Sequence, residues 1–225
     1  VLILVLEGAT AQVGCATGGH EGVLASSHSA RGKRHAENLT PAVEFVCRQA
    51  RVDLSEISCV AVDNGPGLFT GLRVGVASGK AIAQALRVPM ITVSSLDLLA
   101  FPLRYTDRRI ATVIDARRGE VFWAFYRQSP GGVQRLSEPT VGSPDDLAAE
   151  LLAQPGETLL AGDGAIRYAE RFSDRSDAEV AGGDHRPQFA LGCGDVGGTA
   201  RGDVHCCPGL GEGADGGQPA LAPAG

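Results

Sequence analysis

The chain opens with short apolar runs separated by small turn residues. These runs predict three strands, at residues 2–7, 11–17 and 21–28, with glycines in the turns between them. Connections this short favour an antiparallel meander, because a parallel pair needs a longer crossover. The opening of the chain is therefore expected to be a small sheet.

A helical period follows the three strands. The segment 35–50 is predicted to be a helix because its apolar residues fall on one stripe, which is formed by Leu39, Val43, Val46, Cys47 and Ala50. Pro41 fits this helix only in the first turn, where its missing N–H costs little. Further on, the pattern predicts a buried strand at 57–63, a loop at 65–71, a helix at about 71–86 and a buried strand at 89–93.

The same order of elements then begins again. Residues 110–116 and 120–126 predict a hairpin, Ser143 is a good N-cap for a helix, and 158–164 predicts a strand and turn. The sequence therefore predicts an α/β protein with mixed sheets. We expect two similar lobes, at 1–103 and 108–180.

The composition changes from about residue 181. Residues 181–225 are rich in glycine, alanine and proline and show no helical or strand period. Such a composition favours disorder or loose coil. Two interpretations of this segment stay open: a natural tail, or a frameshifted reading of GC-rich DNA.

Charge and cysteine content narrow the class of protein. The 225 residues carry a formal net charge of -6, so direct binding of tRNA is not expected from charge. No apolar run approaches the roughly 18 residues that would cross a bilayer, and the start of the chain is typical of a strand rather than a signal peptide. The six cysteines form no CxxC pair, which favours reduced core thiols in a cytoplasmic protein and makes zinc unlikely.

The most distinctive segment is GPGLFTGLR at 65–73. Its glycines predict a tight turn between a buried strand and a helix, and Gly65, Gly67 and Thr70 are candidates for binding an anion at the helix N-terminus. The segment is neither a P-loop nor a dinucleotide-binding fingerprint, because the lysine is missing and the glycine spacing differs. A structural turn is the favoured interpretation.

The helix predicted at 71–86 is apolar nearly all round. Its polar residues gather in a stripe only about 60° wide, made of Arg73, Lys80, Gln84 and Arg87. Such a helix should be covered on two sides. Gly75 and Gly79 would allow a close helix approach. The second cover is either the helix at 35–50 or a partner protein, and the pattern leaves both open.

Candidate chemistry is sparse. His35 and Glu37 lack the HxxxH spacing of a metal pair, so no metal site is expected. The turn at Glu7 corresponds to a turn that carries an aspartate in two-lobed kinases, but the longer side chain displaces the carboxylate. The charged turn around Asp115 and Arg117 is a candidate anion site, although a solvated hairpin tip is slightly favoured. No residue is predicted to be catalytic.

Four segments together resemble a known family. HAENLTP (35–41), VAVDNGPGLFTGLRVGVASGKAIAQAL (60–86), VPMITVSSLDLLA (88–100) and VIDARRGEVFWAFY (113–126) are similar to the bacterial tRNA threonylcarbamoyladenosine biosynthesis protein TsaB family. The resemblance covers roughly residues 1–175. It departs at Glu7-Gly8-Ala9, where the family has Asp-Thr-Ser/Ala, and at 181–225, where the family has a helix and a Pro-Leu-Tyr ending.

The resemblance implies an actin-like, sugar-kinase-like (ribonuclease-H-like) fold and a subunit without catalytic chemistry. It implies that the chain binds a TsaD-like catalytic subunit, that a TsaE-like ATPase joins them, and that tRNA is reached only through the complex. The family's contact with TsaD maps onto the first two helices, here Leu39, Val43, Val46, Leu72, Gly75, Val76, Gly79 and Ala83.

Several alternatives stay open beside this interpretation. The chain is either such a scaffold or a metal- or ATP-dependent enzyme of the same superfamily, glycoprotease-like or kinase-like. The absent histidine pair argues against the metalloenzyme. A homodimer through the same helix is a third interpretation. No cofactor is expected apart from a nucleotide at a subunit boundary, which the sequence leaves undecided.

Overall fold

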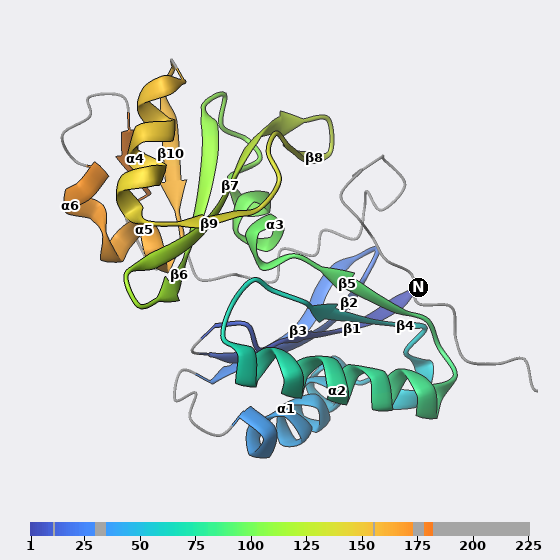
Figure 1. Cartoon of the computed structure of the whole chain (residues 1–225). Coiled ribbons are helices and arrows are strands. Elements are labelled where there is room, and N and C mark those ends of the chain that lie inside the picture. Colours follow the sequence, from blue (N-terminus) through green and yellow to red (C-terminus); the bar gives the residue numbers. More distant parts are fainter. Residues whose placement is uncertain (11, 30–34, 155, 173–177, 182–225) are drawn as a thin grey trace, which may run out of the picture.

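The structure, a computed structural model, describes residues 1–10, 12–29, 35–154, 156–172 and 178–181. Apart from Ala181, the glycine-rich segment predicted at 181–225 lies outside these residues. The described chain forms two lobes, each built on one sheet, and the second lobe lies above the first in Figure 1. The predicted α/β class with mixed sheets is confirmed.

The first sheet has the strand order β3-β2-β1-β4-β5. Its strands are β1 (Leu2–Glu7), β2 (Val13–Gly19), β3 (Gly22–Ser29), β4 (Cys59–Asp63) and β5 (Met90–Val93). The first three form the predicted antiparallel meander, whereas β4 and β5 continue the sheet parallel to β1. Two helices, α1 (His35–Ala50) and α2 (Phe69–Leu86), cover one face of this sheet, and the short η1 (Leu54–Glu56) precedes β4.

The second sheet repeats this order. Its path is β11-β10-β6-β7-β8, and β9 pairs with β7 beside it. The strands are β6 (Arg109–Arg117), β7 (Glu120–Ser129), β8 (Gly132–Arg135), β9 (Thr140–Gly142), β10 (Thr158–Ala161) and β11 (Ala178–Val180), and the helices are α4 (Pro144–Ala153), α5 (Asp163–Arg167) and α6 (Ala169–Phe172). An antiparallel meander extended by parallel strands in both lobes is the arrangement expected of the actin-like class.

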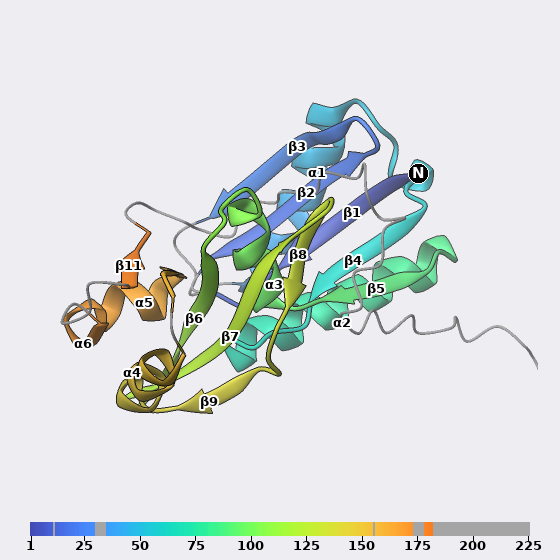
Figure 2. The same cartoon turned by 90° about the horizontal axis from the view of Figure 1, so that it is seen from above.

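A short helix joins the lobes. α3 (Ser95–Ala100) is followed by η2 (Phe101–Leu103), and both fall within the first lobe predicted at 1–103. The apolar side chains of α3 instead lie in the core of the second lobe, where Leu96 and Leu99 belong to one buried cluster with Ile110. In Figure 1 α3 lies between the two sheets, and in Figure 2 it lies behind β7 and β8. The division of the chain at residue 103 stays a prediction.

The helix α1 differs from its expected position in one respect. Because it begins at His35, Pro41 lies inside the helix rather than in its first turn. The proline is exposed, so water can replace the hydrogen bond that its missing N–H would have made. The apolar stripe predicted for this helix is confirmed, since Leu39, Val43 and Val46 are buried in the core of the first lobe.

Candidate functional site

The carboxyl ends of β1, β4 and β5 lie at one edge of the first sheet. The three strands are parallel, and Leu6 pairs with Val62. The residue after Leu6 on β1 is Glu7, and the residue after Val62 on β4 is Asp63. The two acids therefore lie side by side at this edge. Neighbouring strands are separated by about 4.8 Å, which brings the two carboxyl groups into the same small region of the protein. The start of α3 follows β5 at the same edge.

Asp63 is anchored through one of its two carboxyl oxygens. Oδ1 accepts hydrogen bonds from the backbone N–H of Gly65 (2.8 Å) and from Oγ of Ser95 (2.6 Å). Oδ2 is buried and has no hydrogen-bond partner among the described residues. Asp63 is 3% exposed. This burial raises the pKa of Asp63 to about 6, although the two hydrogen bonds act in the opposite direction.

Glu7 is buried equally deeply. It is 2% exposed, and its Oε1 accepts from the backbone N–H of Thr10 (3.2 Å) and from Oγ1 of Thr10 (3.1 Å). Burial, followed by the nearby charge of Asp63, raises the pKa of Glu7 to about 7. We call these two residues the buried acid pair. Among the described residues, no arginine, lysine or histidine forms an ion pair with either carboxylate.

The turn after β1 is filled by the GPG loop. The backbone N–H of Leu68 donates to the carbonyl of Ala9 at 2.6 Å. A side chain at Gly67 would place its Cβ 2.2 Å from that carbonyl oxygen, so only glycine permits this contact. The turn at Glu7–Thr10, which corresponds to a phosphate-binding turn in two-lobed kinases, therefore has protein backbone packed against it.

The predicted anion site on the GPG loop has few free donors. The N–H groups of Gly65 and Leu68 are both used within the chain, and Gly65 is buried. Thr70 is exposed in the first turn of α2. Anion binding by Gly65, Gly67 and Thr70 stays a prediction.

The second predicted anion site contains an arginine that the sequence analysis missed. Oδ2 of the buried Asp115 accepts a hydrogen bond from Arg167 at 2.7 Å and lies 3.3 Å from Nη1 of Arg117. Arg167 comes from α5, and nothing in its local pattern points to this contact. Both guanidinium groups are about half exposed. They therefore have N–H groups directed to solvent, and anion binding at this turn stays a prediction.

The predicted partner-interface residues lie mostly on buried faces. Leu39, Val43, Val46 and Ala83 pack in the first lobe's own core. Gly75 and Gly79 face β4, and a Cβ at Gly79 would lie 2.3 Å from Cγ2 of Val62. These glycines therefore serve the close packing of α2 on its own sheet, and their place in a partner interface stays a prediction. Leu72 and Val76 are partly exposed.

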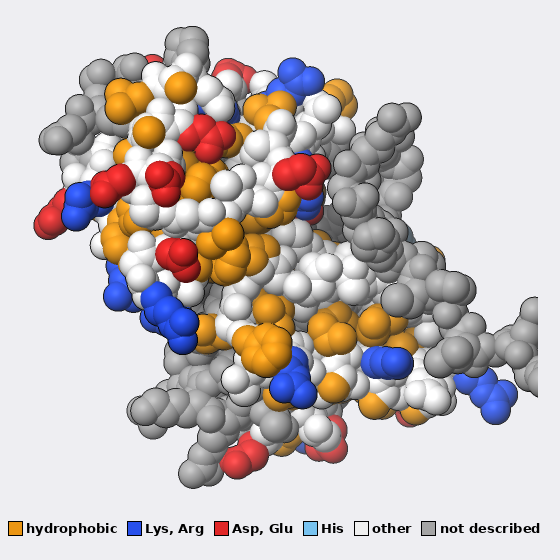
Figure 3. Space-filling model, viewed as in Figure 1, with side chains coloured by type: hydrophobic (Ala, Val, Ile, Leu, Met, Phe, Trp, Pro, Cys, Tyr) orange, Lys and Arg blue, Asp and Glu red, His pale blue; other side chains and the backbone are white. Residues whose placement is uncertain are grey.

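The opposite side of α2 faces solvent. Its residues Phe69, Arg73, Val76, Ala77 and Lys80 fall within about 100° of the helical wheel, and we call them the outer face of α2. Phe69 is 71% exposed, and the Arg73 guanidinium lies 5.3 Å from the centre of its ring. In Figure 3, hydrophobic and basic side chains lie together along the front of the first lobe, over the position of α2.

The described part of the chain has neither a metal-binding cluster nor a membrane-spanning helix. No three residues among its His, Cys, Asp and Glu side chains are arranged to hold a metal ion. None of its helices is long and apolar enough to cross a membrane. Cys15, Cys47 and Cys59 are buried free thiols, and burial raises the pKa of Cys15 to about 12. These three thiols occupy the core, as the sequence predicts.

Comparisons with known proteins agree with the observed geometry. A family model described as TsaD, tRNA N6-adenosine threonylcarbamoyltransferase, matches residues 23–176. An uncharacterized protein of Mycobacterium leprae is 42% identical over 150 residues, which cover 65% of this chain and 40% of that protein. The tRNA threonylcarbamoyladenosine biosynthesis protein TsaB of Bacillus subtilis is 31% identical over 134 residues, which cover 60% of this chain and 58% of that protein.

Solved structures give the same result. YeaZ from Pseudomonas aeruginosa superimposes with a TM-score of 0.69 and 29% identity, over 80% of this chain and 84% of that chain. The chain spans 40% and 58% of the length of the two curated relatives described above. The family model covers more than half of the chain, and the fold and the named relatives agree with it. The chain therefore belongs to the family that the TsaD model describes, and within it to the TsaB/YeaZ group.

Proposed function

We propose that this chain is a non-catalytic subunit of the complex that installs threonylcarbamoyladenosine on tRNA. In this role it binds a TsaD-like catalytic subunit, a TsaE-like ATPase joins them, and tRNA is reached only through the assembly. Two relatives are named tRNA threonylcarbamoyladenosine biosynthesis protein TsaB, which supports a role in this tRNA modification. The net charge of -6 is consistent with a chain that does not bind tRNA alone.

The filled turn after β1 is the observation that carries the non-catalytic role. A phosphate-binding turn presents free backbone N–H groups to its ligand. Here the carbonyl of Ala9 accepts from Leu68, and Gly67 packs against Ala9. A nucleotide phosphate would have to displace this backbone contact. The geometry therefore favours a scaffold over a kinase-like enzyme.

The outer face of α2 is the surface proposed for the catalytic partner. Large aromatic residues and arginines that become desolvated supply most of the binding energy at protein interfaces. Phe69 and Arg73 are already stacked, so little side-chain freedom is lost when they are covered. Lys80 adds a second positive charge on the same face. The complementary surface of the partner should be apolar at its centre and acidic at its rim.

Replacing Phe69 with alanine tests this surface. We expect Phe69→Ala to weaken binding of the TsaD-like protein from the same organism by about 10-fold or more, because an exposed aromatic anchor is lost. The dissociation constant of the purified pair is measured by isothermal titration calorimetry. The unfolding midpoint should change little, since Phe69 is largely solvated in the free chain.

Tyr105 provides a matched control. It is 80% exposed, and the guanidinium of Arg104 lies 4.4 Å from the centre of its ring. Tyr105 and Arg104 therefore form an exposed aromatic–arginine pair that is not on α2. Tyr105→Ala should change the affinity by less than about 2-fold. Equal losses for the two variants would place the contact elsewhere.

The two other interpretations make different predictions for the isolated chain. ATP hydrolysis above background that survives Phe69→Ala would favour the kinase-like enzyme. A homodimer through the same face would appear by analytical ultracentrifugation and would dissociate in Phe69→Ala. A nucleotide held at the subunit boundary would be retained by the complex but not by the free chain.

A further inference from the structure

Among the described residues, no basic side chain forms an ion pair with the buried acid pair. Opposite Glu7 on β2 lies Gly14, opposite Asp63 on β5 lies Val93, and α2 brings Gly71 close to Gly8. Asp97 on α3 is paired with Arg135, and the charged residues Arg73 and Lys80 are exposed on the far side of α2. Two ionised carboxylates would therefore repel each other in a region of low dielectric constant.

The hydrogen bonds indicate how the pair avoids this repulsion. Oε1 of Glu7 accepts from Thr10, and Oδ1 of Asp63 accepts from Gly65 and Ser95. The remaining buried acceptor, Oδ2 of Asp63, has no donor among the described residues. A buried acceptor without a donor destabilises the fold. A proton on the neighbouring Glu7 carboxyl would supply a donor at this place.

We infer that Glu7 keeps its proton in the folded protein near neutral pH and shares it with Oδ2 of Asp63. The pair then carries one negative charge instead of two. A carboxylic acid that donates to a carboxylate forms a short, strong hydrogen bond. This assignment rests on the arrangement of the first lobe and is independent of the proposed role in tRNA modification.

The shared proton also bears on how the two lobes are joined. Asp63 accepts a hydrogen bond from the hydroxyl of Ser95, the first residue of α3. The backbone N–H of Ser95 donates to the carbonyl of Gly65 at 2.9 Å. The remainder of α3 packs into the second lobe. Loss of the proton leaves two carboxylates that repel each other, and one of them, Asp63, holds the hydroxyl of Ser95. The proton therefore stabilises the attachment of α3 to the first lobe, and this stabilisation depends on pH.

The direction of the pH dependence follows from the raised pKa values. A carboxyl group whose folded pKa lies above its unfolded value stabilises the fold fully below the unfolded pKa, which is 4.5 for Glu7. That stabilisation is lost as the pH rises through the folded value of about 7. Asp63 is shifted in the same direction, from 3.8 to about 6. The pair should therefore lower the stability of the fold progressively as the pH rises from the unfolded value of 3.8 for Asp63 to the folded value of about 7 for Glu7, with little further change above about pH 8.

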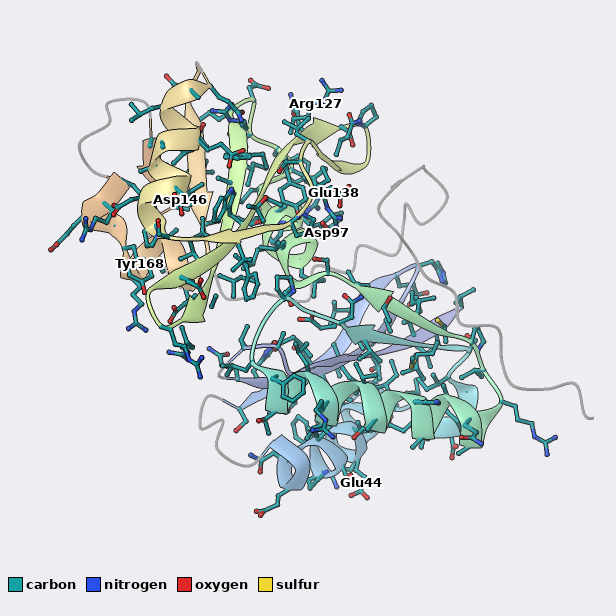
Figure 4. The ribbon with its side chains drawn as sticks, viewed as in Figure 1. Glu44, Asp97, Arg127, Glu138, Asp146 and Tyr168 are labelled. Carbon is teal, nitrogen blue, oxygen red and sulfur yellow. The ribbon has the colours of Figure 1, made fainter. Side chains whose placement is uncertain are left out.

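Thermal unfolding of Glu7→Gln between pH 5 and pH 9 tests the assignment. Glutamine keeps the acceptor for Thr10 and gives Oδ2 of Asp63 a permanent donor. We expect the midpoint Tm of the variant to exceed that of the wild type by about 5 °C or more at pH 8, and by much less at pH 5. Glu44→Gln is the matched control, because Glu44 is exposed on the outer side of α1 (Figure 4). Its Tm should follow that of the wild type at every pH.

A second measurement observes the proton directly. Carbon NMR of the side-chain carboxyl groups should show one glutamate that titrates near neutral pH, and this signal should be absent in Glu7→Gln. In Asp63→Asn the glutamate should titrate at lower pH, because the repelling charge is gone. Amide exchange at Ser95 should accelerate above neutral pH, beyond its intrinsic rate, in the wild type but not in Glu7→Gln.

Three results would overturn the inference. In the first, Glu7→Gln is less stable than the wild type at pH 8. In the second, the difference in Tm between them does not depend on pH. In the third, Mg²⁺ or K⁺ stabilises the wild type but not Glu7→Gln at pH 8, which would assign the position to a metal cation instead of a proton.

Discussion

Gly79→Ala is expected to lower the free energy of unfolding by about 1–2 kcal/mol, because the helix preference for alanine offsets part of an overpacking cost of about 2–3 kcal/mol. The added Cβ would lie 2.3 Å from Cγ2 of Val62 and 3.5 Å from side-chain atoms of Leu6 and Val60. Val62 is 1% exposed, and a β-branched side chain has few alternative rotamers, so α2 must move away from the sheet. This cost exceeds the gain of about 1 kcal/mol from replacing glycine within a helix. Urea unfolding followed by circular dichroism measures the change.

Gly75→Ala serves as the matched control, one turn earlier on the same face of α2. A Cβ there meets Cγ1 of Val62 at 4.0 Å, an ordinary van der Waals contact. The helix preference for alanine should therefore dominate, and the variant should be more stable than the wild type by up to about 1 kcal/mol. Equal effects at the two positions would mean that α2 does not rest on β4 as described.

Asp97→Ala is expected to destabilise the protein by about 3 kcal/mol. Oδ1 of Asp97 accepts from the hydroxyl of Tyr126 at 2.7 Å and from Arg135 at 2.8 Å, and Oδ2 accepts from Arg135 at 2.7 Å. Figure 4 shows Asp97 on α3 beside the strands of the second lobe. The side chains of Arg135 and Asp97 are 17% and 29% exposed, so solvent screens the pair in part. Removing the carboxylate leaves a buried hydroxyl and an arginine without their acceptor.

The comparison for this variant is Asp107→Ala. Asp107 accepts a hydrogen bond from Gln128 at 2.7 Å, but both residues are exposed. Its removal should change the free energy of unfolding by less than about 0.5 kcal/mol. A loss of similar size for Asp97→Ala would show that the Tyr126–Asp97–Arg135 cluster contributes little to holding α3.

The pattern of apolar and turn residues predicted most of the first lobe. Short apolar runs between glycine turns, and the stripe through Leu39, Val43 and Val46, placed three strands and α1 within a few residues of their observed bounds. The weaker elements were missed because their signals are short: β8 and β9 have four and three residues, and α3 has six. The apolar side chains of α3 pack against β6 in the second lobe. A local sequence pattern does not show such a contact between separate elements.

The candidate site shows the same limit. The sequence indicated Glu7 as an unusual residue in the first turn, but it did not bring Glu7 and Asp63 together. That pairing follows from the parallel register of β1 and β4, which are joined across more than fifty residues. The glycines of α2 were recognised as a close-packing feature, yet the direction they face was decided by the sheet beneath them. Sequence period identifies a face of a helix, and only tertiary structure shows what covers it.

The position of α3 has a consequence for how the chain folds. Its first residue, Ser95, is hydrogen-bonded to Asp63 in one lobe, while Leu96 and Leu99 complete the apolar interior of the other. The chain cannot be divided near α3 without loss to one lobe. A division before α3 takes the Ser95 hydroxyl from Asp63, and a division after it takes Leu96 and Leu99 from the core of the second lobe. Loss of either half should therefore expose part of the other. The two lobes should melt together in a single calorimetric transition, with no half-folded species accumulating between them.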